Sequence, residues 1–158
     1  MQIYRHIPKA GSHSPCVLTI GNYDGIHLGH QDLINELLTK SKQKKLESAI
    51  MIFEPHPREF FTPKDAPSRI TSLREKIEYF LSKNIDRVYV VKFDNKFANI
   101  SGNHFISILK KQILAKVILV GEDFRFGSNR EFGINDLIKS SIEISILKEI
   151  RKNNKRVS

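Results

Sequence analysis

Residues 17–30 read VLTIGNYDGIHLGH, and this stretch decides the fold. Its first four residues form an apolar run that Gly21 stops, which is typical of a buried β-strand that ends at a tight turn. Apolar residues then recur at helical spacing between Leu33 and Leu38, so a helix is expected to follow. The stretch therefore predicts a strand, a glycine-bounded turn and a helix, in that order.

The same alternation of strand and helix continues along the chain. Further apolar runs predict strands near residues 49–53, 87–91, 116–120 and 143–147. Helical patterns follow the capping residues Thr71-Ser72 and Ser101, and a shorter helix is expected over 134–139. Strands that alternate with helices form a parallel sheet through right-handed crossovers. The expected fold class is α/β, with a doubly wound, Rossmann-like parallel sheet and helices on both faces.

Composition excludes several classes of protein. The chain has 158 residues, of which 40% are hydrophobic, so residues 1–158 suffice for one domain with a core and are too apolar for a disordered chain. Cys16 stands alone and cannot form an internal disulfide. No apolar run approaches the roughly 20 residues that span a bilayer, and the N-terminus lacks the apolar segment of a signal peptide. We therefore expect a cytoplasmic protein without a membrane partner.

The positive charge is concentrated in two places. The chain has 26 Lys and Arg residues against 17 Asp and Glu, a net charge of +9. The last eleven residues, 148–158, hold five basic residues and one acidic residue, and a second cluster lies between Lys40 and Lys45 at an expected helix end, where cations suit the helix dipole. Neither cluster contains an aromatic residue, so solvated ends are favoured and nucleic acid is disfavoured as a partner.

The turn after the first buried run has the chemistry of a phosphate site. Parallel sheets bind ligands beyond the carboxyl ends of their strands. Gly21 and Gly25 permit a tight turn, and the following helix presents free N–H groups to an anion. His27 and His30 lie three residues apart and share one helix face, where two imidazoles suit phosphate oxygens. Zinc is disfavoured because no third ligand stands at metal-binding spacing.

Residues 21–30 resemble the G-x-F-D-G-x-H-x-G-H signature of the nucleotidyltransferase superfamily, in particular the FMN adenylyltransferase module of bacterial bifunctional riboflavin kinase/FAD synthetases. Three further blocks follow in the family's order. Residues 53–57 (FEPHP) are similar to its Phe-x-Pro-His-Pro, residues 93–98 (FDNKFA) to its F-D-x-x-F-A, and residues 121–127 (GEDFRFG) to its G-x-D-F-R-F-G. The first block alone indicates the superfamily, and the last one narrows it to the flavin branch.

The resemblance implies a reaction in which the phosphate of FMN attacks the α-phosphorus of ATP, giving FAD and pyrophosphate, with Mg²⁺ on the triphosphate. It implies that His27 and His30 are catalytic residues that contact the phosphates. The implied nucleotide-binding residues are Gly21, Asn22, Tyr23, Asp24, Gly25 and Gly29. The implied flavin-binding residues are Pro55, His56, Pro57, Asp123, Phe124, Arg125 and Phe126. No protein ligand for the metal is predicted. Outside these sets, Phe60 and Phe61 are expected to be core or lid packing, and Phe93, Asp94 and Phe97 to be structural.

The sequence departs from the family pattern in two ways. Tyr23 stands where the family usually has Phe, so its hydroxyl needs water or a polar partner. The family also carries a Ser-Ser-Thr-x-x-Arg block that grips the ATP phosphates, and the sequence stops at Ser158, about where this block would begin. We therefore expect a truncated domain without the riboflavin kinase module and with impaired turnover. The alternatives are a weak flavin- or nucleotide-binding remnant and an adenylyltransferase for another small phosphate. The sequence predicts no oligomeric state.

Overall fold

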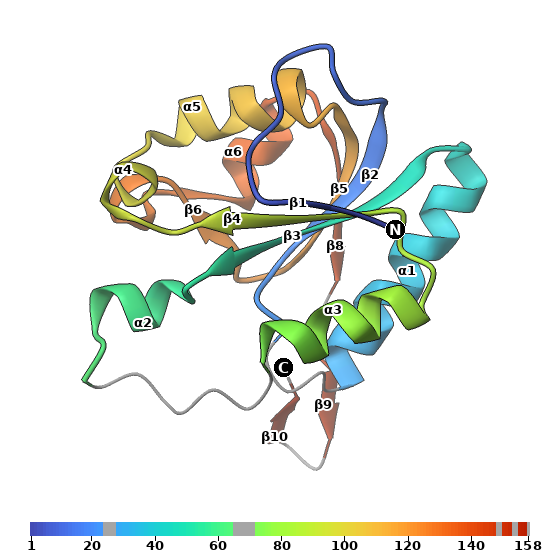
Figure 1. Ribbon diagram of the computed structural model, residues 1–158, viewed down its shortest axis with the longest axis horizontal. Coiled ribbons are helices and arrows are strands. Elements are labelled where there is room, and N and C mark those ends of the chain that lie inside the picture. Colours follow the sequence, from blue (N-terminus) through green and yellow to red (C-terminus); the bar gives the residue numbers. More distant parts are fainter. Residues whose placement is uncertain (24–27, 65–71, 148–149, 153–154, 158) are drawn as a thin grey trace.

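A six-stranded parallel sheet forms the centre of the computed structural model, which describes residues 1–23, 28–64, 72–147, 150–152 and 155–157. The strand order is β1-β4-β3-β2-β5-β8 (Figure 1). From one edge to the other, the strands are β1 (Gln2–Tyr4), β4 (Arg87–Lys92), β3 (Glu47–Glu54), β2 (Cys16–Ile20), β5 (Ala115–Gly121) and β8 (Glu143–Leu147). The expected α/β fold class is confirmed.

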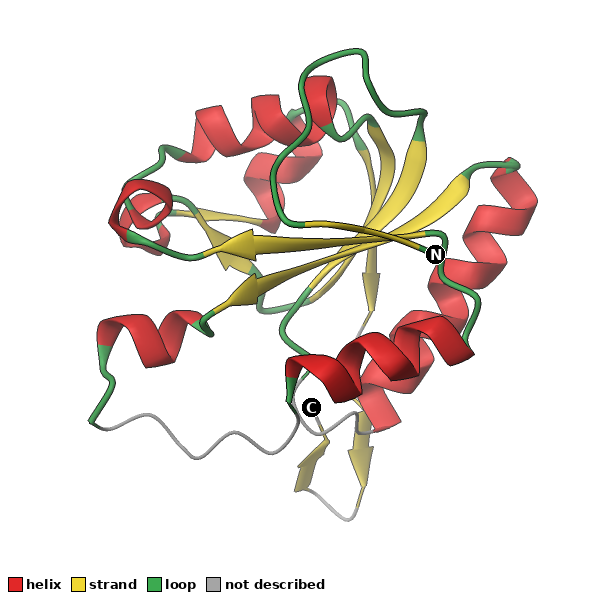
Figure 2. Cartoon of the chain, viewed as in Figure 1, coloured by secondary structure: helices red, strands yellow, loops and turns green. Residues whose placement is uncertain are grey.

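Helices cover both faces of this sheet (Figure 2). On one face lie α1 (Leu28–Lys44) and α3 (Leu73–Ser82). On the other face lie α5 (Gly102–Ser107), the π-helical turn Ile108–Gln112 that continues it, and α6 (Ile134–Lys139). Two short helices, α2 (Pro57–Phe61) and α4 (Asn95–Ala98), follow the ends of β3 and β4.

Strand β2 shows why the central runs are apolar throughout. Cys16, Leu18 and Ile20 pack toward the α5 side, whereas Val17 packs toward the α1 side, and all four are buried. Successive side chains of a strand point to opposite faces, and a parallel sheet covered on both sides must bury both sets. This double burial produces continuous apolar runs, which is why these strands were the easiest elements to predict.

The structure also confirms Ser72 and Ser101 as the capping residues of two predicted helices. The Ser72 hydroxyl accepts the N–H of Glu75 at 3.1 Å, and the Glu75 carboxylate accepts the N–H of Ser72 at 3.3 Å, which together form a capping box. The Ser101 hydroxyl accepts the N–H of His104 at 3.0 Å. Thr71 lies outside the described residues.

Several short elements were not predicted. They are β1, α2, α4 and two antiparallel hairpins, of which β6 (Arg125–Phe126) and β7 (Phe132–Gly133) form one and β9 (Ile150–Lys152) and β10 (Lys155–Val157) form the other. Each strand among them has only two or three residues, too few to show a period. Strand β1 is in addition an edge strand whose Ile3 is 45% exposed.

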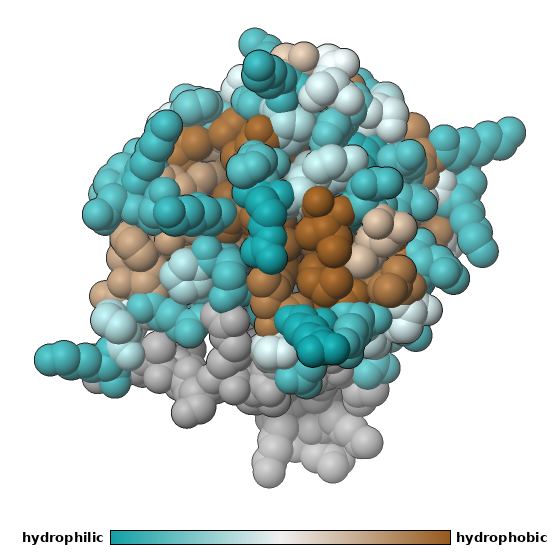
Figure 3. Space-filling model, viewed as in Figure 1, coloured by the Kyte–Doolittle hydropathy of each residue, from teal (hydrophilic) through white to brown (hydrophobic). Residues whose placement is uncertain are grey.

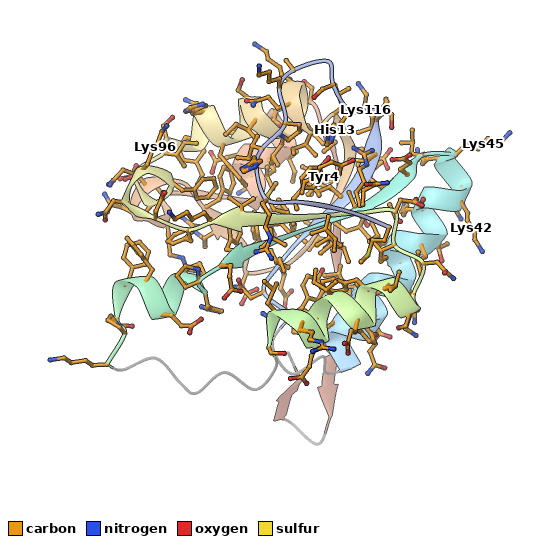
Figure 4. The ribbon with its side chains drawn as sticks, viewed as in Figure 1. Tyr4, His13, Lys42, Lys45, Lys96 and Lys116 are labelled. Atoms are coloured by element: carbon orange, nitrogen blue, oxygen red, sulfur yellow. The ribbon has the colours of Figure 1, made fainter. Side chains whose placement is uncertain are left out.

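The lysine cluster of residues 40–45 lies at the C-terminal end of α1. Lys42 and Lys45 project outward there (Figure 4). Lys44 Nζ lies 3.2 Å from Glu143 Oε1, an exposed ion pair that adds little to stability. These exposed side chains agree with the expected solvated helix end.

Across the described residues, no helix combines the length and the apolarity that crossing a membrane requires.

A buried polar network closes the amino-terminal end of the sheet. Arg87 is 3% exposed, and its Nε lies 2.8 Å from Oε2 of Glu47. Its Nη2 donates to the main-chain oxygen of Ser14 at 2.7 Å, and its Nη1 donates to the Tyr89 hydroxyl at 3.0 Å. Nδ1 of His13 lies 2.6 Å from the same Tyr89 hydroxyl, and the two share a hydrogen bond. Burial and the nearby Arg87 guanidinium both disfavour a charged His13 in this network.

The network predicts a pH-dependent stability. Burial lowers the pKa of His13 below its ordinary 6.5, Arg87 lowers it further, and Glu47 acts in the opposite direction. Because the unfolded chain binds this proton more readily, protonation favours unfolding, and the contribution of His13 is lost as the pH falls through its folded pKa. We expect Tm to decrease from about pH 8 to about pH 5, and to decrease less in His13→Gln.

Thermal unfolding across this pH range checks the expectation. The exposed His6 lies in the same connection between β1 and β2, so His6→Gln is the matched control and keeps the parental slope. An unchanged slope in His13→Gln contradicts the role of His13. Figure 4 shows His13 beside Tyr4, whose ring centroid lies 4.4 Å from that of His13.

Candidate functional site

The four sequence blocks all follow the carboxyl ends of adjacent strands. Strands β4, β3, β2 and β5 are neighbours in the sheet, and each block begins within one residue of the end of its strand. The carboxyl ends of parallel strands meet at one edge of a sheet, where α/β proteins bind ligands. The structure therefore brings residues separated by about a hundred positions to one edge, as the sequence predicted.

The turn after β2 is tightly packed. The Gly21 N–H donates to the main-chain oxygen of Met51 at 3.1 Å, which ties the turn to β3. A Cβ at Gly21 would lie 3.1 Å from the Tyr23 ring, closer than nearly all real contacts. Tyr23 itself has a φ of 58°, in the left-handed region that costs energy for a residue with a side chain. The turn that follows β2 therefore contains a residue with a strained backbone.

Tyr23 was expected to bind nucleotide, but its side chain belongs to the core. It is 1% exposed, and its hydroxyl lies 2.9 Å from Oγ1 of Thr19. This hydrogen bond is the polar partner that the departure from Phe requires, and burial raises the pKa of Tyr23. The ring packs against His30 at 4.9 Å and edge-on against Phe80 at 5.4 Å. Only the main chain of Tyr23 is left for a ligand.

His30 lies in the first turn of α1 and is half-buried. The Tyr23 ring, tilted by 51° against the imidazole, fixes the orientation of its side chain. Gly29 lies beside it in the same turn. The Oδ1 atom of Asn22 is buried and has no hydrogen-bond partner among the described residues, which makes it an acceptor that a ligand could satisfy.

Three predicted residues of this first block, Asp24, Gly25 and His27, lie outside the described residues. The predicted pairing of His27 with His30 therefore stays a prediction.

The second block leads from β3 into α2. The Glu54–Pro55 peptide bond is cis, and α2 begins at Pro57. The His56 N–H donates to Oε1 of Glu59 at 3.0 Å, which satisfies a free amide at the start of this helix. Pro55 is exposed, whereas His56 and Pro57 are half-buried. The helix carries Phe60 and Phe61.

Nine of the ten phenylalanines form one continuous set of ring contacts along this edge. We call it the phenylalanine cluster, and its members are Phe53, Phe60, Phe61, Phe93, Phe97, Phe105, Phe124, Phe126 and Phe132. Neighbouring ring centroids lie between 5.2 Å and 6.0 Å apart. The cluster joins β3, α2, the residue that follows β4, α4, α5 and the β6–β7 hairpin. It is buried at Phe105 and open at Phe61, which is 60% exposed.

The fourth block forms the β6–β7 hairpin. Phe124 is half-buried and stacks on the buried Phe126 at 5.7 Å, whereas Asp123 is exposed. Arg125 is exposed, and its guanidinium donates to the main-chain oxygens of Arg130 at 2.9 Å and Glu131 at 3.1 Å. These hydrogen bonds fix the loop between β6 and β7. Arg125 therefore has a structural role, and its positive charge also lies at the carboxyl edge of the sheet.

Two glycines seat this hairpin on α5. Gly127 has a φ of 79°, and a Cβ there would lie 2.9 Å from N and Cα of Gly102. A Cβ at Gly102 would lie 2.2 Å from the Phe132 ring. The N–H of Ser128 donates to the main-chain oxygen of Ile100 at 2.8 Å across the same contact. Only glycine allows these backbones to approach so closely.

The described residues contain no group of three or more His, Cys, Asp or Glu side chains that could hold a metal ion. An apolar hollow of about 290 Å³ lies at the other side of the sheet, between β1 and α3, where hydrophobic side chains gather in Figure 3. Its lining residues are Ile3, Arg5, Leu73, Arg74, Ile77, Glu78 and Val90. None of them belongs to the four sequence blocks, so this hollow is separate from the candidate site.

The FAD synthetase family model matches residues 9–158 of the chain. A bifunctional riboflavin kinase/FMN adenylyltransferase of Escherichia coli K12 is 43% identical over 129 residues, which cover 81% of this chain and 41% of the relative. The protein of the same name from Buchnera aphidicola subsp. Acyrthosiphon pisum is 41% identical over 150 residues, covering 92% and 48%. The chain thus spans less than half the length of these curated relatives.

Two solved structures share the fold. One is described as a macrolide-efflux protein from Streptococcus pneumoniae, with a TM-score of 0.82, 23% identity, and coverage of 99% of this chain and 54% of that one. The other is a pantoate-beta-alanine ligase from Francisella tularensis, with a TM-score of 0.55, 18% identity, and coverage of 97% and 69%. At these identities, the likeness concerns the fold alone.

Proposed function

Because the chain belongs to the FAD synthetase family, we propose that it transfers AMP from ATP to FMN and releases pyrophosphate. The observation that carries this proposal is the arrangement of the carboxyl edge. An open phenylalanine cluster lies beyond β3, β4 and β5, and the turn that precedes α1 lies beyond their neighbour β2. An aromatic surface beside a helix start suits a substrate that has a flat ring at one end and a phosphate at the other.

The nucleotide end is the turn after β2 together with the start of α1. In the proposed reaction, an oxygen of the FMN phosphate attacks the α-phosphorus of ATP, and the bond to pyrophosphate breaks. No covalent enzyme intermediate is needed, so the protein aligns the reactants and stabilises the growing charge. We assign that stabilisation to His27 and His30, and contacts to the nucleotide to Gly21, Asn22, Asp24, Gly25, Gly29 and the main chain of Tyr23. Mg²⁺ enters as part of the MgATP substrate.

The flavin end is the open part of the phenylalanine cluster. Phe61 is 60% exposed and contacts Phe60 and Phe93, so its ring extends the cluster to the surface and offers an aromatic face to a ligand. We propose that an isoalloxazine ring rests against this surface and contacts Pro55, His56, Pro57 and Phe124. Asp123 and Arg125 supply polar groups at the rim, and Phe126, being buried, supports Phe124 from below.

The test is FAD synthesis by the purified chain. With MgATP and FMN we expect FAD, and with MgATP and 4′-phosphopantetheine we expect no adenylylated product. Product from the second substrate alone would identify an adenylyltransferase for another small phosphate. Stabilisation by ligands without any product would identify a binding remnant.

The variant Phe61→Ala completes this experiment. Because Phe61 is exposed, its loss should leave folding intact and raise the KM for FMN about two- to tenfold, the worth of one aromatic stacking contact, with the KM for ATP unchanged. Leu81→Ala is the control, since Leu81 is a similarly exposed residue on α3. An unchanged KM for FMN in Phe61→Ala would contradict the flavin position.

A further inference from the structure

Exposed lysines gather at the amino-terminal edge of the sheet. Helix α1, the π-helical turn and α6 each end a few residues before a strand, so their C-terminal ends lie where β3, β5 and β8 begin. We call the exposed lysines of this edge the lysine surface. Its members are Lys42, Lys44 and Lys45 at the end of α1, Lys110 and Lys111 in the π-helical turn, Lys116 in β5, and Lys139 in α6.

Contacts around the start of β8 join these segments. Lys44 Nζ lies 3.2 Å from Oε1 of Glu143, the first residue of β8. Lys110 Nζ donates to the main-chain oxygen of Ser140 at 2.7 Å, just before the same strand. Lys116 lies in the neighbouring strand β5, one residue before the position that pairs with Glu143. The lysine surface is therefore continuous, although its members are far apart in the sequence.

The helix dipole explains only part of this surface. Cations are favourable in the last turn of a helix, but this does not account for Lys45 or Lys116. Lys45 follows α1 with a φ of 56°, which costs energy for a residue with a side chain. Its N–H donates to the main-chain oxygen of Lys42 at 3.3 Å, and the N–H of Leu46 donates to that of Ser41 at 3.0 Å. This helix-ending motif usually places glycine where Lys45 stands.

Lys116 is the exposed residue of a strand that is otherwise buried up to its last residue. Ala115 and residues 117–120 are buried, and β5 lies between β2 and β8 in the sheet. Figure 4 shows Lys116 with Lys42 and Lys45 on one side of the molecule, and Lys96 of α4 on the other. Lys116 thus adds its charge to the lysine surface from the interior of the sheet order.

Carboxylates at the same edge leave most of this charge unpaired. Glu143 is paired with Lys44, and Glu47 with the buried Arg87. Like charges that crowd together repel one another and destabilise the folded chain, so an anionic partner would relieve this repulsion. Within the part of the chain that the structure describes, no ion pair is formed by Lys42, Lys45, Lys111, Lys116 or Lys139.

The composition of the lysine surface favours carboxylates over nucleic acid as its partner. It contains no arginine, whose planar fork matches phosphate, and no aromatic ring on which bases could stack. The Glu143 carboxylate, which Lys44 binds, belongs to an extended strand. Carboxylates carried by an extended chain therefore suit these ammonium groups.

We propose that the lysine surface docks an extended, acidic segment of a partner protein through ion pairs with its Asp or Glu side chains. The surface lies at the amino-terminal edge of the sheet, opposite the carboxyl edge that carries the candidate site. The segment can therefore bind while the candidate site stays open. This inference does not depend on the proposed function.

Fluorescence anisotropy of the full chain with a labelled peptide of about ten glutamates tests the inference. At about 0.05 M salt, where screening is weak, we expect saturable binding that weakens as salt is added. Lys45→Gly/Lys116→Gln should weaken binding about three- to tenfold, the worth of two exposed ion pairs. The matched control is Lys92→Gln/Lys96→Gln, which removes the same charge from exposed residues near the carboxyl edge and should keep the parental affinity within about twofold.

Four outcomes would overturn the inference. The parent does not bind the peptide, or both double variants lose affinity equally, which would show that only net charge matters. In the other two, the parent binds duplex RNA or phosphatidylserine vesicles more tightly than the peptide at the same salt concentration, which would identify another class of partner. If Lys45→Gly/Lys116→Gln does not fold, Lys42→Gln/Lys111→Gln takes its place with the same expected loss.

Discussion

His30→Ala is expected to lower the rate of FAD formation by about 10²- to 10³-fold, the usual cost of removing one positioned group that stabilises charge in a transition state. The imidazole is held in place by the Tyr23 ring at the start of α1, so its loss removes an aligned donor. Because charge grows on the phosphates only as the bond to pyrophosphate breaks, the effect should fall on kcat more than on the KM for ATP. Pyrophosphate release that depends on both FMN and MgATP measures the rate.

Two controls accompany this variant. His104→Ala removes an exposed histidine on α5 and should leave the rate unchanged. Tyr23→Phe keeps the ring that orients His30 and removes only the hydroxyl that is bonded to Thr19, so it should retain most of the activity. Equal rates in His30→Ala and the parent would reject His30 as a catalytic residue.

Gly102→Ala is expected to lower the free energy of unfolding by about 3 kcal/mol, the upper part of the range for overpacked sites. The added Cβ would lie 2.2 Å from Cγ of Phe132, so the whole ring must move. The same ring packs against Phe126 at 5.5 Å, so its movement also disturbs the packing within the hairpin. Displacing Phe132 therefore unseats the β6–β7 hairpin from α5.

Urea unfolding of parent and variant measures this loss. Asn103→Ala is the control, because Asn103 is the next residue of α5 and is exposed, so it should change stability by less than about 0.5 kcal/mol. At temperatures where Gly102→Ala remains folded, we expect a raised KM for FMN, since the hairpin carries Phe124 and Arg125. An unfolding midpoint equal to that of the parent would contradict the close contact.

The sequence predicts the central sheet well because its strands are buried on both faces. Residues 49–53 and 117–120 show unbroken apolar runs for this reason, and the structure confirms strands over both. Strand β1 has no such run, because it lies at the sheet edge with only Tyr4 partly buried among its three residues. The hairpins depend on contacts such as those between Arg125 and residues 130–131, which local sequence does not encode.

The sequence also predicts that the four blocks meet at one edge of the sheet, and the structure brings them together there, but the sequence does not predict how their side chains pack. The family signature gives Tyr23 no distinct role, and only the contacts with Thr19, His30 and Phe80 show that the ring is buried. The phenylalanine cluster joins residues from 53 to 132, so no local window contains it.

The fate of the α-phosphate of ATP tests the central claim most directly. The chain is incubated with FMN and with MgATP that carries a radioactive label on either the α- or the γ-phosphate, and the products are separated. If the carboxyl edge catalyses adenylyl transfer, the α-label appears in FAD and the γ-label in pyrophosphate, in equal amounts. A γ-label on the flavin product would contradict the account. So would an α-label that stays in ATP, ADP and AMP although FMN is bound.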